Sequence, residues 1–316
     1  MLSRIGNSLF WMGRYIERTE HIARYTKVQY VSSVDVPLGQ SRDLIMESIL
    51  DMAGSRGNYT QVQEQLLEDE VINYITISDS NPYSLIGYIG MIRENARGAR
   101  DRLSIELWEA INSFYHKTNH YTPEDLQNEG VEAFARKIEE HSYVIKGYID
   151  NTLLRNEEWR LISLGIYLER AIQICQILQT KLKDIEKIDS VKLKGALENY
   201  HWTTILESTE SFDMYMRCQR TPPNRHNVLH FLLFDMDFPK SVAFSLSNVK
   251  NCIQGISFQE EKRTSSLDFI AGKLACRFSY NTIEEVENSA TEFLKNTLQS
   301  IYELTHLLDV KYLKYK

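Results

Sequence analysis

Apolar residues recur at intervals of three, four and seven along much of the chain, and this spacing restricts the fold to helices that bury one side. The first stripe consists of Ile5, Leu9, Met12, Ile16 and Ala23. Two further stripes lie in residues 85–103 and 286–308. The chain has only 14 glycines and 6 prolines in 316 residues, too few to end many short strands. We therefore predict an all-helical bundle.

The composition permits a large core and excludes some classes of protein. Hydrophobic residues make up 43% of the chain and charged residues 25%, as in globular proteins. The formal net charge of −7 argues against a broad nucleic-acid-binding surface. No long uninterrupted apolar run indicates a membrane span, and the first residues lack a signal-peptide cleavage site. We expect a cytoplasmic protein that binds neither nucleic acid nor membrane.

The chain resembles itself at two places, which indicates an internal duplication. Residues 12–18 match residues 164–170, with Gly, Tyr, Glu and Arg at the same positions. Residues 71–75 match residues 228–232, and the register continues through a proline and a serine in each copy. Two matches in the same order with nearly the same offset favour two diverged copies of one multi-helix unit. We expect the halves, about 1–150 and 151–316, to form a single domain, because no Pro- or Gly-rich linker separates them.

Charged residues flank the buried side of the first predicted helix. Each helical residue turns by about 100°, so Glu17, Glu20 and Arg24 lie on one flank of the stripe centred on Ile16. Arg14 and Arg18 point nearly the opposite way and need solvent, a partner or a second helix. The first helix therefore carries two carboxylates and a guanidinium at the edge of the core.

A second charged segment follows at residues 93–102. Arg93, Arg97 and Arg100 form a cationic row at i, i+4 and i+7. Like charges at this spacing repel, so such a row usually faces carboxylates or a bound anion. We expect Glu17 and Glu20 to be those carboxylates, provided that the first helix packs beside residues 83–104. The cluster is then either a functional pocket or an ion-pair network that fixes helix register.

The second half keeps only part of this charge. Glu169 and Arg170 repeat Glu17 and Arg18. The remaining charged positions change: Glu20 aligns with Ile172, Arg24 with Gln176 and Arg93 with Lys250. If there is a single site, we expect it mainly in the first half.

Histidine, cysteine and nucleotide patterns indicate neither a metal nor an intrinsic cofactor. Two histidine pairs have helical metal-ligand spacing, His116 with His120 and His226 with His230. They lack the glutamate of an HExxH motif, so we expect surface or loop histidines. The four cysteines lack zinc spacing, and we expect reduced thiols. The absence of phosphate-binding loops argues against an ATP-using enzyme acting alone.

Several motifs together resemble the bacterial alpha-E family. The resemblance is carried by the opening Met1-Leu2-Ser3-Arg4, by Trp11 to Glu20 and by Ala23-Arg24. It continues in Asn81-Pro82 with residues 93–97, in residues 164–171 and in residues 237–242. Asn7 stands where the family usually has glutamate, and Lys240 stands where arginine is common. Apart from these departures the resemblance spans nearly the whole chain.

The resemblance implies an all-helical domain, named for its glutamates, that occurs alongside or fused to circularly permuted ATP-grasp proteins. It also implies proximity to transglutaminase-like peptidases, and hence peptide or amide-bond modification. ATP and Mg²⁺ would then belong to the partner only. Carried over position by position, the family's charged motif falls on Arg14, Glu17, Arg18, Glu20, Arg24, Arg93, Glu94, Asn95, Arg97, Glu169 and Arg170.

Three interpretations of function remain open. In the first, the chain is an accessory module that docks on an ATP-grasp ligase-like partner through Arg14 and Arg18 and presents a peptide or protein substrate. In the second, it is a peptide-modifying or hydrolytic enzyme with Glu17 or Glu20 as general acid or base. The residues expected to bind an anion or substrate are Arg24, Arg93, Glu94, Asn95, Arg97 and Arg100. In the third, the charges form a purely structural network.

Overall fold

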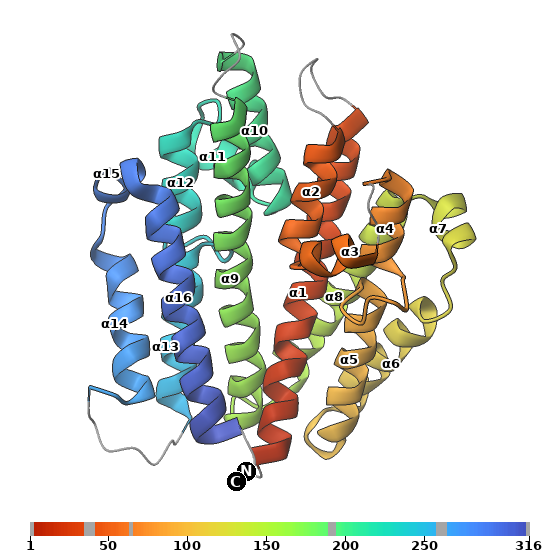
Figure 1. Ribbon diagram of the computed structural model, residues 1–316. Coiled ribbons are helices and arrows are strands. Elements are labelled where there is room, and N and C mark those ends of the chain that lie inside the picture. The colour runs from red at the N-terminus through yellow and green to blue at the C-terminus, as the bar shows by residue number, and fades with distance from the viewer. Residues whose placement is uncertain (1–2, 35–41, 63–65, 189–193, 257–263, 314–316) are drawn as a thin grey trace.

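A computed structural model describes residues 3–34, 42–62, 66–188, 194–256 and 264–313. In these ranges the regular structure is entirely helical, as the apolar spacing predicts. The two longest helices, α1 (Ser3–Val34) and α9 (Glu157–Ile188), have 32 residues each. They lie side by side in the middle of the molecule, with the earlier helices beside α1 and the later ones beside α9 (Figure 1).

The remaining helices fall into two groups along the chain. The first half contributes α2 (Arg42–Met52), α3 (Arg56–Val62), α4 (Glu68–Thr76), α5 (Leu85–Gly98), α6 (Ile105–Thr118), α7 (Pro123–Glu129) and α8 (Val131–Thr152). The second half contributes α10 (Lys194–Ser208), α11 (Phe212–Gln219), α12 (Arg225–Phe234), α13 (Val242–Gly255), α14 (Leu267–Tyr280), α15 (Ile283–Val286) and α16 (Ala290–Leu308). Short turns of other helix types are η1 (Arg100–Arg102), η2 (Glu287–Ser289) and η3 (Asp309–Leu313).

Each long helix is the centre of a corresponding set of helices. In the first half α5 and α8 pack on α1, and α6 packs on both of them. In the second half α13 and α16 pack on α9, and α14 packs on both of them. The helices therefore follow the same order in both halves. The core is formed by the apolar stripes that all these helices turn inward.

Equivalent helices also begin with the same local chemistry. Ser84 caps α5 by accepting a hydrogen bond from the Gly87 amide, and Ser241 caps α13 in the same way. Each serine follows a proline by two residues, and each capped helix has 14 residues. Capping boxes at Thr122 and Thr282, each with an acidic residue three positions later, start α7 and α15. These caps define where the core helices start, and so orient their charged flanks.

Two glycines allow α1 and α9 to approach each other closely. A Cβ atom on Gly13 would overlap the carbonyl oxygen of Ile162 in α9. A Cβ atom on Gly165 would overlap the carbonyl oxygen of Phe10 in α1. Both contacts join residues close to 152 positions apart, so the two helices run parallel and meet reciprocally. Contacts of this kind need residues without side chains, as at close helix crossings elsewhere.

The central helix α9 contains a long apolar stretch. Residues Glu157–Ile185 are long and apolar enough to span a membrane, but 83% of the most apolar window is buried inside the fold. Helices from both halves surround it. This burial is typical of the core helix of a soluble protein.

Candidate functional site

The crossing of α1 and α9 buries ionised side chains beside the two glycines. Glu169 of α9 is fully buried and accepts hydrogen bonds of 2.6 and 2.9 Å from Arg18 of α1. It also accepts one of 2.7 Å from Arg14 and one of 2.7 Å from Gln173. One carboxylate is therefore shared by two guanidinium groups at the crossing.

The reciprocal pair lies on the other side of the crossing. Glu17 of α1 is fully buried and accepts hydrogen bonds of 2.6 and 3.2 Å from Arg170 of α9. Lys146 of α8 also pairs with Glu17, and His21 lies 3.2 Å from it. Each Glu-Arg dipeptide thus pairs its glutamate with the arginine of the other dipeptide.

A third buried carboxylate, Glu20, extends the network away from the crossing. Arg24 donates to it at 2.5 Å, one helical turn away. Lys146 pairs with Glu20 as well as with Glu17, and Lys240 lies 3.6 Å from it. Side chains of α1, α8 and the segment before α13 therefore converge on one flank of the core, as the helical-wheel argument predicts for Glu17, Glu20 and Arg24.

The network reaches solvent through Arg24. This guanidinium donates to the Tyr143 hydroxyl at 2.7 Å and lies 3.1 Å from Glu210. Glu210, between α10 and α11, also pairs with Lys240 and Tyr143, and about half of its side chain (47%) is exposed. The cluster is thus buried at Glu17 and Glu20 and reaches the surface at Glu210 and Tyr143.

The surrounding cations keep the buried carboxylates ionised. Burial raises the pKa of Glu169, but Arg18 and Arg14 outweigh it and lower this pKa to about 2. Burial likewise opposes ionisation of Glu17, yet Arg170 and Lys146 hold its pKa well below the usual range. For Glu20, Lys146 and Arg24 have the same effect on the pKa. Burial lowers the pKa of His21, so its ring is neutral at pH 7.

The predicted pairing of the Arg93 row with Glu17 and Glu20 is wrong. Helix α5 does pack on α1, but it does so through Leu85, Tyr88, Ile89, Ile92 and Ala96. Arg93 instead donates to Asn112 of α6 at 2.8 Å and lies over the Tyr115 ring. Arg93 therefore lies on the flank of α5 that faces α6, too far round the helix to reach the carboxylates of α1.

The other residues of that segment have local partners. Arg97 pairs with Glu94, and both side chains are more than half exposed. Asn95 donates to the carbonyl of Met91 at 2.8 Å, and Arg100 lies over the Trp108 ring. The structure therefore does not bring Arg93, Arg97 and Arg100 together with the carboxylates of α1.

Arg14 and Arg18 contact a second helix, which is one of the three possibilities (solvent, a partner or a second helix) that their direction on α1 allows. Arg14 is only 4% exposed and lies between Glu169 and the Trp11 ring. It is therefore unavailable as a surface contact for a partner, contrary to the sequence-based expectation. Arg18 keeps 22% of its side chain exposed and borders a cavity. Arg14 is buried because the close approach at Gly13 places α9 over this face of α1.

Several members of the network were not predicted from the sequence, namely Lys146, Glu139, Tyr143, Glu210 and Lys240. Two of them carried a usable signal. Glu139 and Lys146 of α8 directly follow the buried Ile138 and Ile145, just as Glu17 follows Ile16. A charge next to a buried position lies at the edge of the core. Glu210 lies in a loop, where no such periodicity exists.

A cavity of about 400 Å³ opens on the Arg18 side of the crossing. Five of its thirteen lining residues are aromatic, and the full lining is Trp11, Tyr15, Arg18, Ile22, Met52, Ala53, Gly54, Tyr83, Tyr88, Ile172, Gln173, Gln176 and Tyr302. A second hollow, of about 630 Å³, adjoins it at Gln176 and Tyr302 and runs between α9 and α16. In contrast, neither Glu17 nor Glu20 lines this cavity, the second hollow or any of three other pronounced hollows in the described part of the chain.

The remaining reactive groups are separate from one another. Within the described ranges, no three histidine, cysteine or acidic side chains gather as metal ligands would. His226 lies 2.9 Å from Glu287, as a surface ion pair. All four cysteines are free thiols, with Cys175 and Cys252 buried and Cys218 and Cys276 exposed.

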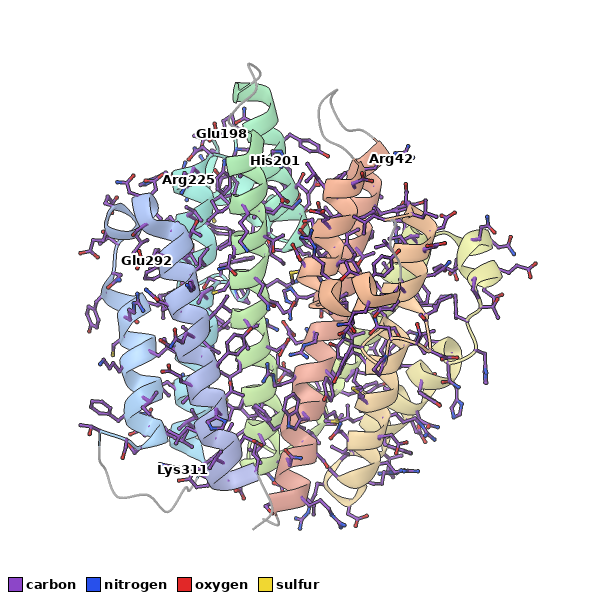
Figure 2. The ribbon with its side chains drawn as sticks, in the orientation of Figure 1. Arg42, Glu198, His201, Arg225, Glu292 and Lys311 are labelled. Carbon is purple, nitrogen blue, oxygen red and sulfur yellow. The ribbon has the colours of Figure 1, made fainter. Side chains whose placement is uncertain are left out.

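Charged residues at the surface differ from this interior network. Glu292 of α16 and Lys311 after it are exposed, at the outside of the bundle, whereas side chains fill the space between α1 and α9 (Figure 2). Ion pairs at exposed positions contribute little to stability. In a buried pair, by contrast, each charged group needs its partner, because a buried charge without one strongly destabilises the fold. The buried network is therefore the feature of the charge distribution that most constrains the fold.

Comparison with known proteins relates this network to a family. A family model for Alpha-E, described as a predicted alpha-helical domain with a conserved ER motif, matches residues 1–313. An uncharacterized protein of Mycobacterium bovis and one of Mycobacterium tuberculosis strain CDC 1551 are each 21% identical to this chain over 319 residues. The match covers 96% of this chain but 35% of each relative, so the chain spans about a third of their length. No solved structure matches it.

Proposed function

The chain belongs to the Alpha-E family, and from this premise we propose that it is a helical binding module. It works with a circularly permuted ATP-grasp ligase-like protein in the cytoplasm and presents a peptide or protein for amide-bond modification. A transglutaminase-like peptidase is a further partner in this proposal. ATP and Mg²⁺ bind to the ATP-grasp partner.

The burial and ion pairing of Glu17 and Glu20 are the observation that favours a binding role over a hydrolytic one. Both carboxylates are fully buried, and Arg170, Lys146 and Arg24 occupy their oxygens. A general base needs a pKa near the working pH and access to a substrate proton. The pKa of each carboxyl group is held well below its usual range. These features suit a network that fixes helix positions.

The reciprocal geometry supports an origin by duplication, which makes the chain one domain over residues 1–316 with halves of about 1–150 and 151–316. Gly13 and Gly165 exchange equivalent backbone contacts. The two Glu-Arg dipeptides exchange equivalent ion pairs. Even the hydrogen bond between Gln29 and Lys181 joins residues 152 positions apart. The cavity beside Arg18 lies on one side of this crossing and is available for binding.

The length of the relatives supports a module that acts with other domains. The matched segment is 35% of each mycobacterial relative, so most of each relative lies outside it. A helical unit of this size joined to further sequence is the arrangement expected of an accessory domain. The cavity beside Arg18 provides a place where such a domain could hold a substrate.

The proposal is tested by co-expression with a circularly permuted ATP-grasp protein of the same organism. We expect the two to copurify and the complex to consume ATP faster with suitable peptides than the partner does alone. Failure to form a complex would overturn the proposal. The Glu17→Gln variant, checked for folding by circular dichroism, separates the alternatives. Turnover that survives this change supports an accessory module, and turnover lost from an intact complex indicates a catalytic carboxylate.

A further inference from the structure

We propose that the 400 Å³ cavity beside Arg18 binds the C-terminal residue of a peptide, with its free carboxylate at the Arg18 guanidinium. This inference rests on the proposed function, because it names the class of substrate that the module holds. The cavity lies between α1, α5, α9 and α16, on the opposite side of the crossing from Glu17 and Glu20.

The charge at the cavity wall is positive. Arg14 and Arg18 share Glu169, so two guanidinium groups face one carboxylate. Glu17 cannot compensate, since Arg170 and Lys146 already pair with it. Arg14 is buried, whereas Arg18 is partly exposed and lines the cavity. A guanidinium has five N–H donors; Glu169 accepts from two of those on Arg18, and the Tyr88 side chain is hydrogen-bonded to the same guanidinium, so donors remain for a ligand. The excess positive charge is therefore presented to the cavity by Arg18.

A buried hydrogen-bond acceptor lies next to this cation. Gln173 donates its amide nitrogen to Glu169 at 2.7 Å, and this bond fixes the direction of its side chain. Its Oε1 atom is buried and has no hydrogen-bond partner, although the residue lines the cavity. Buried polar atoms are nearly always paired, because an unpaired one loses its hydration without compensation. A ligand N–H would satisfy Oε1.

A peptide C-terminal residue carries the two groups that these side chains would recognise. Its carboxylate is an anion that arginine binds with charge-assisted hydrogen bonds. Its backbone N–H is the donor that Gln173 Oε1 lacks. The aromatic walls, formed by Trp11, Tyr15, Tyr83, Tyr88 and Tyr302, suit an apolar or aromatic side chain on the same residue. A free anion such as phosphate would match the cation but not the acceptor or the walls.

The residues that precede the C-terminal one would lie in the adjoining hollow. It shares Gln176 and Tyr302 with the cavity and continues along α9 and α16 past Leu298 and His306. The two spaces share two wall residues, so a peptide of several residues could occupy both. An extended chain that ends in the aromatic cavity would lay its preceding residues in this hollow.

The test is direct binding to the intact chain by isothermal titration calorimetry. The probes are acetylated tetrapeptides that end in each of the twenty amino acids, prepared both as free acids and as C-terminal amides. We expect at least one free acid to bind, with affinity about tenfold or more above that of its amide, as for loss of one charge-assisted hydrogen bond. We also expect the corresponding acetylated single residue to bind more weakly than the tetrapeptide.

Variants locate the site. Tyr302→Ala removes one wall from a half-exposed position of α16 and should weaken the best free acid at least fivefold. Tyr280→Ala, at an exposed tyrosine of α14 outside the cavity, is the matched control and should leave binding unchanged. Arg18→Gln should abolish the preference for acid over amide. Because this variant also breaks a buried ion pair, Tyr302→Ala keeps the test valid if Arg18→Gln fails to fold.

The inference would be overturned if no free acid bound at millimolar concentration, or if acids and amides bound equally. Binding that is insensitive to Tyr302→Ala would also overturn it, since the site would then lie elsewhere. These outcomes are separate from those of the copurification experiment. A peptide that binds without complex formation refutes the partnership alone, and a complex without peptide binding refutes this site alone.

Discussion

Arg18 and Glu169 lie 151 residues apart in the sequence and are joined by two hydrogen bonds, of 2.6 and 2.9 Å, across the centre of the molecule. Their sequence neighbours, Glu17 and Arg170, form the reciprocal pair. Glu-Arg occurs at only these two places in the chain. In this structure the dipeptide that the family description singles out therefore links the two central helices. The two reciprocal ion pairs, Arg18 with Glu169 and Glu17 with Arg170, are called the joint below. Its role can be tested independently of any activity.

Removal of one carboxylate from the joint should strongly destabilise the fold. Glu169→Gln leaves the buried Arg14 and the partly exposed Arg18 without a counter-charge, and we expect it to lower the free energy of unfolding by about 3–5 kcal/mol. Urea denaturation followed by circular dichroism measures this change. Glu132→Gln is the matched control, because its 2.6 Å pair with Arg136 is exposed and should contribute less than about 1 kcal/mol. Equal losses for both variants would contradict a structural role for the joint.

The glycines at the crossing should not tolerate a methyl group. Gly13→Ala and Gly165→Ala place a Cβ atom against a carbonyl oxygen of the other helix, and backbone there must shift. We expect each to destabilise the protein by about 1–3 kcal/mol, as overpacked cores do. Gly272→Ala in α14 meets no atom within 4 Å and should instead stabilise the protein by about 0.5–1 kcal/mol. Thermal denaturation of the three variants measures these changes. If Gly13→Ala and Gly165→Ala stabilised the protein as Gly272→Ala should, glycine would not be sterically required at the crossing.

Acid should weaken the fold through Glu169. Its pKa in the folded protein is about 2, below the ordinary value of 4.5. A depressed folded pKa contributes stability that is complete above pH 4.5 and is lost as the pH falls towards 2. The difference corresponds to about 3 kcal/mol. Unfolding free energies measured between pH 5 and 2 should therefore fall more steeply for the wild-type protein than for Glu169→Gln, and parallel curves would argue against the ionised pair.

The thiols offer an inexpensive test of the packing. Burial raises the pKa of Cys175 to about 12, and burial likewise raises that of Cys252 to about 12 despite Arg160. Cys218 and Cys276 are exposed. Because the thiolate is the reactive form, a disulfide reagent at pH 8 should modify two thiols rapidly in the native protein and all four in guanidinium chloride. Rapid reaction of more than two thiols in native buffer would show that α9 or α13 is less well covered than the structure indicates.

Much of the local structure is predictable from the sequence, because it depends on residues near each other in the chain. The apolar stripes define the helices, and the capping boxes at Thr122 and Thr282 mark two of their starts. The angle around the first helix correctly placed Glu17 and Glu20 beside the core, and Arg14 and Arg18 on another side. These results follow from the 3.6-residue period alone.

The partners of those charges depend on packing, and there the sequence was insufficient. Arg93 carries the right charge, and α5 does pack on α1, yet Arg93 lies on the α6 side of its helix. Lys146 and Arg170 occupy the place that was expected for it. The helical period gives the side of the helix on which a residue lies. Which neighbouring helix contacts that side depends on how the helices pack. Only the tertiary structure decided that Glu17 meets Arg170, because close packing at Gly13 and Gly165 brings two segments 152 residues apart into contact.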